Sequence, residues 1–173
     1  MDFNQNFFEL FRLEVGFDLD LERLREQFQI LQREVHPDRY ADQDARSQRL
    51  ATQWSMHVNE AFSVLSKPLP RAIYLLGLTN IVLEQNPTLE PDFLFEQITL
   101  RESLDHVVET RSVDDLAVLL DEFSEKLMAE QSQFSQRFDA GALDLATQSV
   151  YRMQFLNKLQ IAAQQAEEML WDE

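Results

Sequence analysis

An imidazole and a carboxylate lie on either side of a proline at His36, Pro37 and Asp38. A neutral imidazole can donate a hydrogen bond from one ring nitrogen and accept one at the other. A carboxylate can accept charge-assisted hydrogen bonds from an arginine. Proline restricts the backbone and so pre-orders the tripeptide. The three residues could bind a partner surface, or they could form an ordinary turn, because proline and aspartate are common turn residues.

The residues around this tripeptide predict two helices joined by a loop. Asp20 is a good N-cap for the first helix, and Pro37 disfavours helical geometry at His36, so that helix must end there. A polar stretch over residues 39–46 then leads to the second helix. Two such helices should pack as an antiparallel hairpin with the tripeptide at its tip. The predicted core stripes are Leu21, Leu24, Phe28, Leu31 and Val35 in the first helix, and Leu50, Trp54, His57 or Val58, Ala61 and Leu65 in the second.

Two shorter helices are predicted to flank this hairpin. The first follows Asn4 or Asn6 as its N-cap and carries several apolar residues. The second begins at Pro70, since proline is favoured in the first turn of a helix, and ends near residue 76. We expect Gly77 and the residues up to 91 to form a linker.

Three further amphipathic helices are predicted after the linker. The first covers about residues 92–109. The second is capped by Asp114 and ended by Gly141, and the third covers about residues 143–170. Short connections between such helices indicate an antiparallel bundle. The sequence therefore predicts an all-α protein with one domain over residues 1–76, a linker over 77–91 and a three-helix bundle over 92–173.

The charge and composition exclude several classes of protein. With 45% hydrophobic residues, the 173-residue chain can bury a core, and with no cysteine it forms no disulfide and no thiolate metal site. The net charge of −16 argues against nucleic-acid binding. No apolar run is long enough to span a membrane, and the first residues do not resemble a secretory signal. We therefore expect a cytoplasmic protein.

The distribution of charge indicates two different surfaces. Residues 1–76 hold 9 Lys and Arg and 12 Asp and Glu, whereas residues 77–173 hold 6 and 19. The net charges are −3 and −13, which suggests two partners.

Metal binding and catalysis are not expected. His36, His57 and His106 lack the spacing that places two metal ligands on one helix face. The neighbouring carboxylates of residues 114–115 and 167–168 have no pocket signature. We therefore predict no cofactor, no metal and no enzyme activity.

The order of elements around the tripeptide resembles a J domain. A short helix, a long helix, the His36-Pro37-Asp38 loop and a second long helix ending in residues 59–66 (NEAFSVLS) follow one another as in that family. The resemblance implies that the loop contacts a DnaK-type chaperone and stimulates its ATP hydrolysis. J domains usually carry basic residues on the helix before the loop. Arg25 and Arg33 match this expectation, and Arg39 lies just past the loop. Each arginine could equally belong to a solvated face of mixed charge.

Residues 67–76 (KPLPRAIYLL) narrow the resemblance to HscB, the J-type co-chaperones of iron–sulfur cluster assembly. Residues 93–104 and 155–159 also resemble that family, so the likeness spans nearly the whole chain. It implies a J domain followed by a C-terminal three-helix bundle. It also implies two partners, which are the DnaK-type chaperone HscA and the cluster scaffold IscU. Direct cluster binding by this chain is not expected, because it has no cysteine ligand.

The helix over residues 92–109 carries more apolar residues than one stripe needs. At about 100° per residue, Phe93, Leu100, Leu104 and Val107 share one side. A second apolar set, Leu94, Phe95 and Ile98, lies roughly 100–200° around the helix. This second set could line a wide core, bind a partner or support self-association. The HscB resemblance implies that it binds the scaffold. The implied scaffold-binding residues are Leu94, Phe95, Ile98, Thr99, Glu102, His106 and Phe155.

Two of these positions depart from the family pattern. Thr99 and His106 stand where acidic residues are common, so the acidic rim of the predicted patch is thinner. The function expected from the whole pattern is a co-chaperone that stimulates an HscA-like ATPase and delivers an IscU-like scaffold to it. The alternative is an interaction protein with a J-like fold and no ATPase-stimulating activity.

Overall fold

The computed structural model describes residues 3–171, apart from the side chain of Trp171, and this part of the chain contains helices and no strand. It separates into two compact units between Thr79 and Asn80. The all-α class predicted from the sequence is confirmed.

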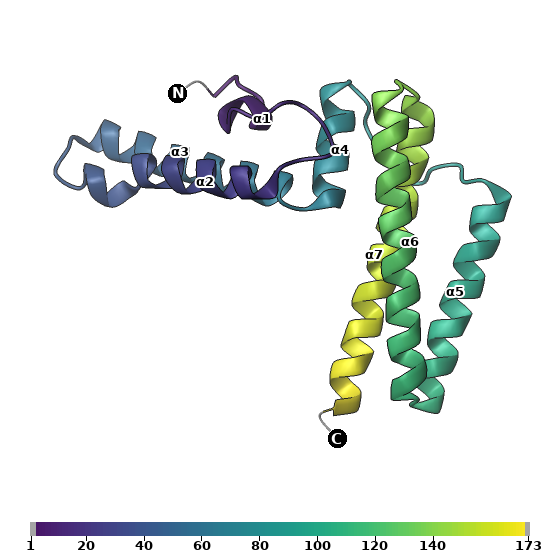
Figure 1. Cartoon of the computed structure of the whole chain (residues 1–173). Coiled ribbons are helices and arrows are strands. Elements are labelled where there is room, and N and C mark those ends of the chain that lie inside the picture. Colours follow the sequence, from purple (N-terminus) through teal and green to yellow (C-terminus); the bar gives the residue numbers. More distant parts are fainter. Residues whose placement is uncertain (1–2, 172–173) are drawn as a thin grey trace. The chain divides into compact units, whose positions relative to one another are not determined.

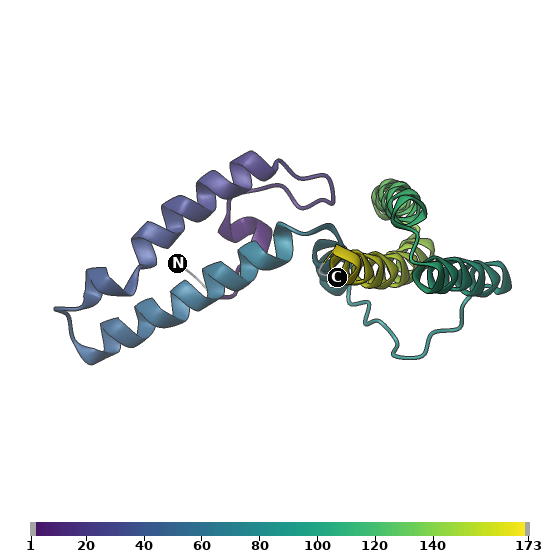
Figure 2. The ribbon, with the colours of Figure 1, turned by 90° about the horizontal axis from the view of Figure 1, so that it is seen from below.

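The first unit is built on an antiparallel helical hairpin (Figures 1 and 2). The short helix α1 (Phe7–Leu10) precedes α2 (Leu21–Val35), and a 3-10 helix, η1 (Pro37–Tyr40), follows α2. Helices α3 (Ala45–Leu65) and α4 (Pro68–Leu78) complete the unit. The His36-Pro37-Asp38 tripeptide therefore lies at the α2–α3 connection, as the periodicity predicted.

Side-chain caps define where these helices begin. The Asp20 carboxylate accepts hydrogen bonds from the backbone N–H groups of Glu22 and Arg23, both at 3.0 Å. Asn6 and Glu9 form a reciprocal capping box at the start of α1. Both caps satisfy N–H groups that have no partner within the helix.

The core of the first unit lies between α2 and α3, with α1 and α4 covering it. Its largest fully buried side chains are Phe8, Phe11, Leu24, Val58, Leu65, Leu75 and Leu76. The prediction that Leu50 belongs to this core is wrong, because its side chain is 46% exposed. The buried stripe of α3 begins at Ala51 instead and continues through Trp54 and Val58, which lie three or four residues apart.

Helix α4 differs from the sequence-based expectation at both ends. It begins at Pro68 rather than Pro70, because the first turn of a helix needs no backbone N–H donor and so tolerates both prolines. It also includes Gly77 and ends at Leu78. Beyond α4, the backbone N–H of Glu84 donates to the hydroxyl of Tyr151 at 2.9 Å, which ties the connecting segment to the second unit.

The second unit is a three-helix bundle of α5 (Pro91–Thr110), α6 (Val113–Asp139) and α7 (Leu143–Trp171). Helices α6 and α7 make the most extensive contact, and α5 packs on both. Ser112, not Asp114, caps α6, since the Ser112 hydroxyl accepts from the backbone N–H of Asp115 at 3.3 Å. Asp114 lies two residues further on, within the first turn of α6, where its carboxylate still interacts favourably with the positive end of the helix dipole.

None of the helices within residues 3–171 is long and apolar enough to span a membrane.

Arg71 joins three segments of the first unit. It is a buried residue of α4, and its guanidinium donates to the carbonyl of Leu65 at the end of α3. The same guanidinium lies 4.9 Å from the ring centroid of Phe17, in the segment before α2. Carbonyls at the end of a helix lack intrahelical donors, so Arg71 caps α3 from a neighbouring helix.

We predict that Arg71→Ala lowers the free energy of unfolding of the first unit by about 2–3 kcal/mol, because a buried charged donor and a cation–π contact are lost together. Urea denaturation monitored by the fluorescence of Trp54, in a Trp171→Phe background, measures this free energy of unfolding. Arg49→Ala, at an exposed position of α3, should change it by less than about 0.5 kcal/mol. Equal effects of the two substitutions would contradict the assigned role.

Candidate functional site

The tripeptide presents its ionisable groups outward. His36 has φ −59° and ψ 125°, the extended conformation expected before proline, and α2 ends at Val35. The Nδ1 atom of His36 accepts from the backbone N–H of Asp38 at 3.3 Å, so in the neutral ring the hydrogen is carried by Nε2. The side chains of His36 and Asp38 are 52% and 89% exposed. Both groups are therefore accessible to a partner.

Two side chains beyond the tripeptide hold it against the end of α2. Arg39 Nη1 donates to the carbonyl of Arg33 at 3.2 Å, and the Tyr40 hydroxyl donates to the carbonyl of Glu34 at the same distance. These contacts satisfy carbonyls that α2 leaves without partners. The contribution of Tyr40 was not predicted, although a polar aromatic residue just after a proline-terminated helix was a usable signal.

The structure brings together two of the three arginines predicted to bind the chaperone. Arg33 and Arg39 line one shallow hollow with His36 and Gln32. Arg25 is also exposed, but it lies eight residues before Arg33, which is about 12 Å along the helix axis. Arg25 therefore belongs to the same helix and not to the same hollow.

Helix α5 divides its apolar residues between two faces, as its periodicity predicted. The stripe of Phe93, Leu100, Leu104 and Val107 is buried in the bundle. The second set remains in solvent, with Leu94 45%, Phe95 72% and Ile98 56% exposed. These exposures exclude the wide-core alternative. We refer to Leu94, Phe95 and Ile98 as the α5 patch.

The other predicted scaffold-binding residues fall into two groups. Thr99, Glu102 and His106 are exposed on α5, and the Thr99 hydroxyl donates to the carbonyl of Phe95 at 3.1 Å. Phe155 of α7 is only partly exposed and packs on the bundle core, with its ring edge-to-face with that of Phe93 at 6.0 Å. Phe155 therefore supports α5 from within the bundle and contributes less open surface than the α5 patch.

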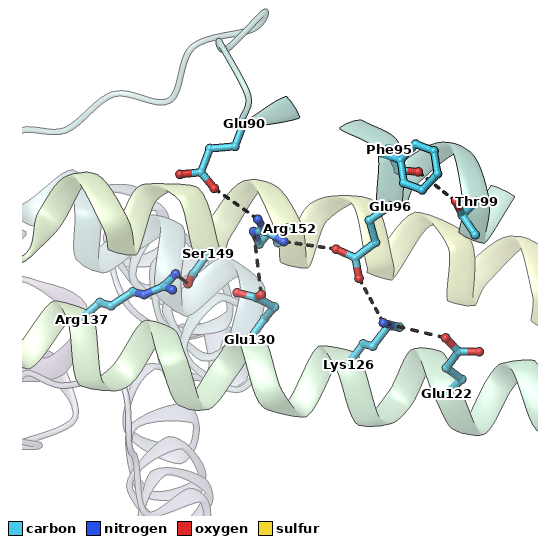
Figure 3. A network of polar contacts seen from close by, with 10 residues as sticks. All are labelled: Glu90, Phe95, Glu96, Thr99, Glu122, Lys126, Glu130, Arg137, Ser149 and Arg152. Carbon is cyan, nitrogen blue, oxygen red and sulfur yellow. Dashed lines mark hydrogen bonds and ion pairs between the residues drawn. The ribbon is translucent and has the colours of Figure 1, made fainter. Parts of the chain in front are cut away.

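A network of charged side chains fastens the start of α5 to the other two helices (Figure 3). The guanidinium of Arg152, on α7, lies 3.2 Å from a carboxylate oxygen of Glu96, 3.5 Å from one of Glu90 and 3.9 Å from one of Glu130. Lys126 of α6 donates to Glu96 at 3.0 Å. This network was not predicted from the sequence, although Glu96 interrupts the apolar stripe between residues 93 and 100.

Glu130 is the most desolvated carboxyl of the network. Its side chain is 13% exposed, and its Oε2 atom is buried without a hydrogen-bond partner. Burial raises the pKa of Glu130, with a smaller contribution from the Glu96 carboxylate, while the Ser149 hydroxyl, Arg152 and Arg137 oppose this rise. Desolvation outweighs the nearby cations because the carboxyl has lost most of its hydration.

Among the described residues, no three histidine or carboxylate side chains come together as metal ligands would.

Known proteins share both the fold and much of the sequence. Residues 89–164 match the family described as the HSCB C-terminal oligomerisation domain. A co-chaperone protein HscB homolog from Cupriavidus taiwanensis is 35% identical over 169 residues, and the match covers 96% of each chain. The chain belongs to the HscB family of co-chaperones. Solved structures share its fold.

Chaperone HscB from Vibrio cholerae has a TM-score of 0.87 and 31% identity, and the match covers 96% of this chain and 99% of that one. Human co-chaperone protein HscB has a TM-score of 0.89 at 23% identity, over 95% of this chain and 83% of that one, and supports the fold alone. The first unit is thus the J domain of an HscB-type protein, and the second is its C-terminal helical bundle. The protein is a J-type co-chaperone.

The raised pKa of Glu130 predicts a pH dependence of stability. A folded-state pKa above the ordinary value of 4.5 means that the folded protein binds this proton more tightly than the unfolded chain does. The contribution of Glu130 to the free energy of unfolding should therefore increase as the pH falls through the raised pKa towards 4.5, and should be constant below it.

Urea denaturation of the unaltered protein and of Glu130→Gln, at several pH values from about 7 to about 4, measures this contribution. The difference between the two free energies of unfolding should shift in favour of the unaltered protein as the pH falls, because glutamine does not titrate. Glu125→Gln, an exposed position of α6, controls for the loss of one negative charge. A difference that shifts the other way would show that Glu130 is stabilised as a carboxylate.

Proposed function

We propose that this protein is a co-chaperone of iron–sulfur cluster assembly. In this proposal it stimulates ATP hydrolysis by an HscA-like DnaK-type chaperone and delivers an IscU-like scaffold protein to it. The observation that carries the proposal is that one unit bears the outward-facing His36-Pro37-Asp38 loop and the other bears the exposed α5 patch. Membership of the HscB family supports both halves.

The loop would act by binding and not by chemistry of its own. Asp38 can accept hydrogen bonds from an arginine of the chaperone, and His36 can donate from Nε2. Arg33 and Arg39, with Arg25 further along α2, would face acidic groups of the same partner. Binding that is tighter to the hydrolysis-competent state of the ATPase than to its other states would shift the chaperone towards that state.

The α5 patch would provide the apolar centre of the scaffold interface. Burying exposed apolar surface contributes about 25 cal/mol per Å². Thr99, Glu102 and His106 would form a polar rim that fixes the orientation of the scaffold. Since Glu102 is the one acid among these three rim residues, we expect the apolar centre to contribute most of the affinity.

The two binding surfaces share no residue, so their activities should be separable. A change in the loop should remove ATPase stimulation and leave scaffold affinity intact. A change in the α5 patch should have the opposite effect.

We predict that His36→Gln and Asp38→Asn each abolish stimulation of the ATPase of a purified HscA-like chaperone, because each removes an exposed group that the chaperone would contact. Steady-state phosphate release measures the stimulation, and unchanged far-UV circular dichroism shows that the fold is kept. Asp42→Asn, another exposed aspartate after the loop, is the matched control and should retain stimulation. Retained stimulation by the loop variants would favour an interaction protein with an inactive J-like fold.

We predict that the triple substitution Leu94→Ala, Phe95→Ala and Ile98→Ala weakens scaffold binding by at least about tenfold, equivalent to about 1.4 kcal/mol. Phe155 is left unchanged because it also packs on the core. Titration calorimetry with an IscU-like scaffold measures the affinity, and stimulation of the chaperone without scaffold should be unchanged. The control is Val118→Ala with Met128→Ala, which removes similarly exposed apolar side chains from α6. An unchanged affinity of the triple variant would place the scaffold site elsewhere.

A further inference from the structure

We propose that Arg152 is a positioning residue for scaffold binding. Its guanidinium ties the turn of α5 that carries the α5 patch to α6 and α7, and so sets the direction in which Leu94, Phe95 and Ile98 point. This inference rests on the proposed scaffold-binding function, which it deepens.

The beginning of α5, over residues 91–99, has one buried apolar residue, Phe93. Its buried stripe skips from Phe93 to Leu100, almost two helical turns, and the inward positions between them are occupied by Glu96 and Gln97, both partly buried. A cavity of about 170 Å³ lies beneath this stretch, between α5 and the other two helices. Polar contacts must therefore fasten the same turns that bear the α5 patch.

Arg152 makes most of these contacts at once. Its guanidinium lies over the ring of Phe93, at 4.4 Å from the centroid. It also pairs with Glu96 and reaches Glu90, the residue that precedes α5 (Figure 3). It is 3.9 Å from Glu130 on α6. The Arg152 side chain is only 22% exposed, so these pairs are less screened by water than ordinary surface pairs.

The geometry of these contacts is directional. Apolar burial has no preferred orientation and would tolerate some rotation of α5 about its axis. A planar guanidinium holds its donors in a fixed fork, and here it faces carboxylates six residues apart, Glu90 and Glu96. Rotating α5 by one residue, about 100°, would break both pairs and would also turn the α5 patch away.

Removing the Arg152 charge should loosen α5 without detaching it. Glu96 and Glu130 would lose their shared cation and would repel each other across the cavity. Lys126 would still pair with Glu96, and the stripe from Leu100 to Val107 would remain buried. The expected effect is therefore local to residues 91–100.

The test uses the full-length protein with Arg152→Met, which keeps an apolar stem of similar length. Scaffold affinity, measured by calorimetry with an IscU-like protein, should fall about fivefold to tenfold. Amide hydrogen exchange should accelerate over residues 91–100 and stay unchanged in the α6–α7 core. Arg152→Lys, which keeps the charge, should recover part of the affinity. Lys158→Met, at an exposed position of α7, should match the unaltered protein.

A double-substitution cycle separates positioning from general stabilisation. If Arg152 acts through the α5 patch, Arg152→Met should cost less affinity in a Phe95→Ala background than in the unaltered protein. Additive losses, faster exchange throughout the bundle, or full affinity of Arg152→Met would each overturn the role. Failure of the unaltered protein to bind scaffold would instead overturn the proposed function, and the positioning role with it.

Discussion

The burial of one apolar face of α5, and of the facing sides of α2 and α3, is the constraint on which both surfaces of this protein depend. Helix α5 can turn only one face to α6 and α7, and Phe93, Leu100, Leu104 and Val107 occupy it. The α5 patch is left in solvent because those side chains are already inside. An exposed cluster of large apolar residues is unfavourable in water, and this exposure supports the proposed scaffold site.

The His36-Pro37-Asp38 loop depends on the packing of α2 against α3. Pro37 ends α2 at Val35, and the buried faces of α2 and α3 bring the chain back on itself just beyond that point. Arg39 and Tyr40 then use the unpaired carbonyls of α2 as anchors, so the end of the helix becomes part of the loop. The end of α2 imposed by Pro37 and the capping contacts of its last carbonyls together keep the side chains of His36 and Asp38 exposed.

The charged network under α5 shows how a bundle can trade stability for orientation. An apolar residue in place of Glu96 would fill the cavity and bury more surface. The Glu96 carboxylate instead pairs with Arg152 and Lys126. The neighbouring Glu130 keeps one buried oxygen that lacks a hydrogen bond. Such an arrangement stabilises the bundle less than close apolar packing would, but it fixes the orientation of α5 relative to α6 and α7. A fixed orientation of α5 is what the proposed role of the α5 patch requires.

The sequence by itself determined the helices, the loop and the two faces of α5. Local rules are sufficient for these features, because capping by Asp20, the stop at Pro37 and the spacing of apolar residues act within a few turns. The exact residue at which a buried stripe or a helix begins was not determined in this way, as Leu50 and the cap at Ser112 show. A shift of one or two positions leaves the spacing of apolar residues almost unchanged. Only the tertiary structure decided that the α5 patch is exposed and that Arg152 meets Glu96, 56 residues apart in the chain. Such contacts depend on how three helices pack against one another, which no local pattern records.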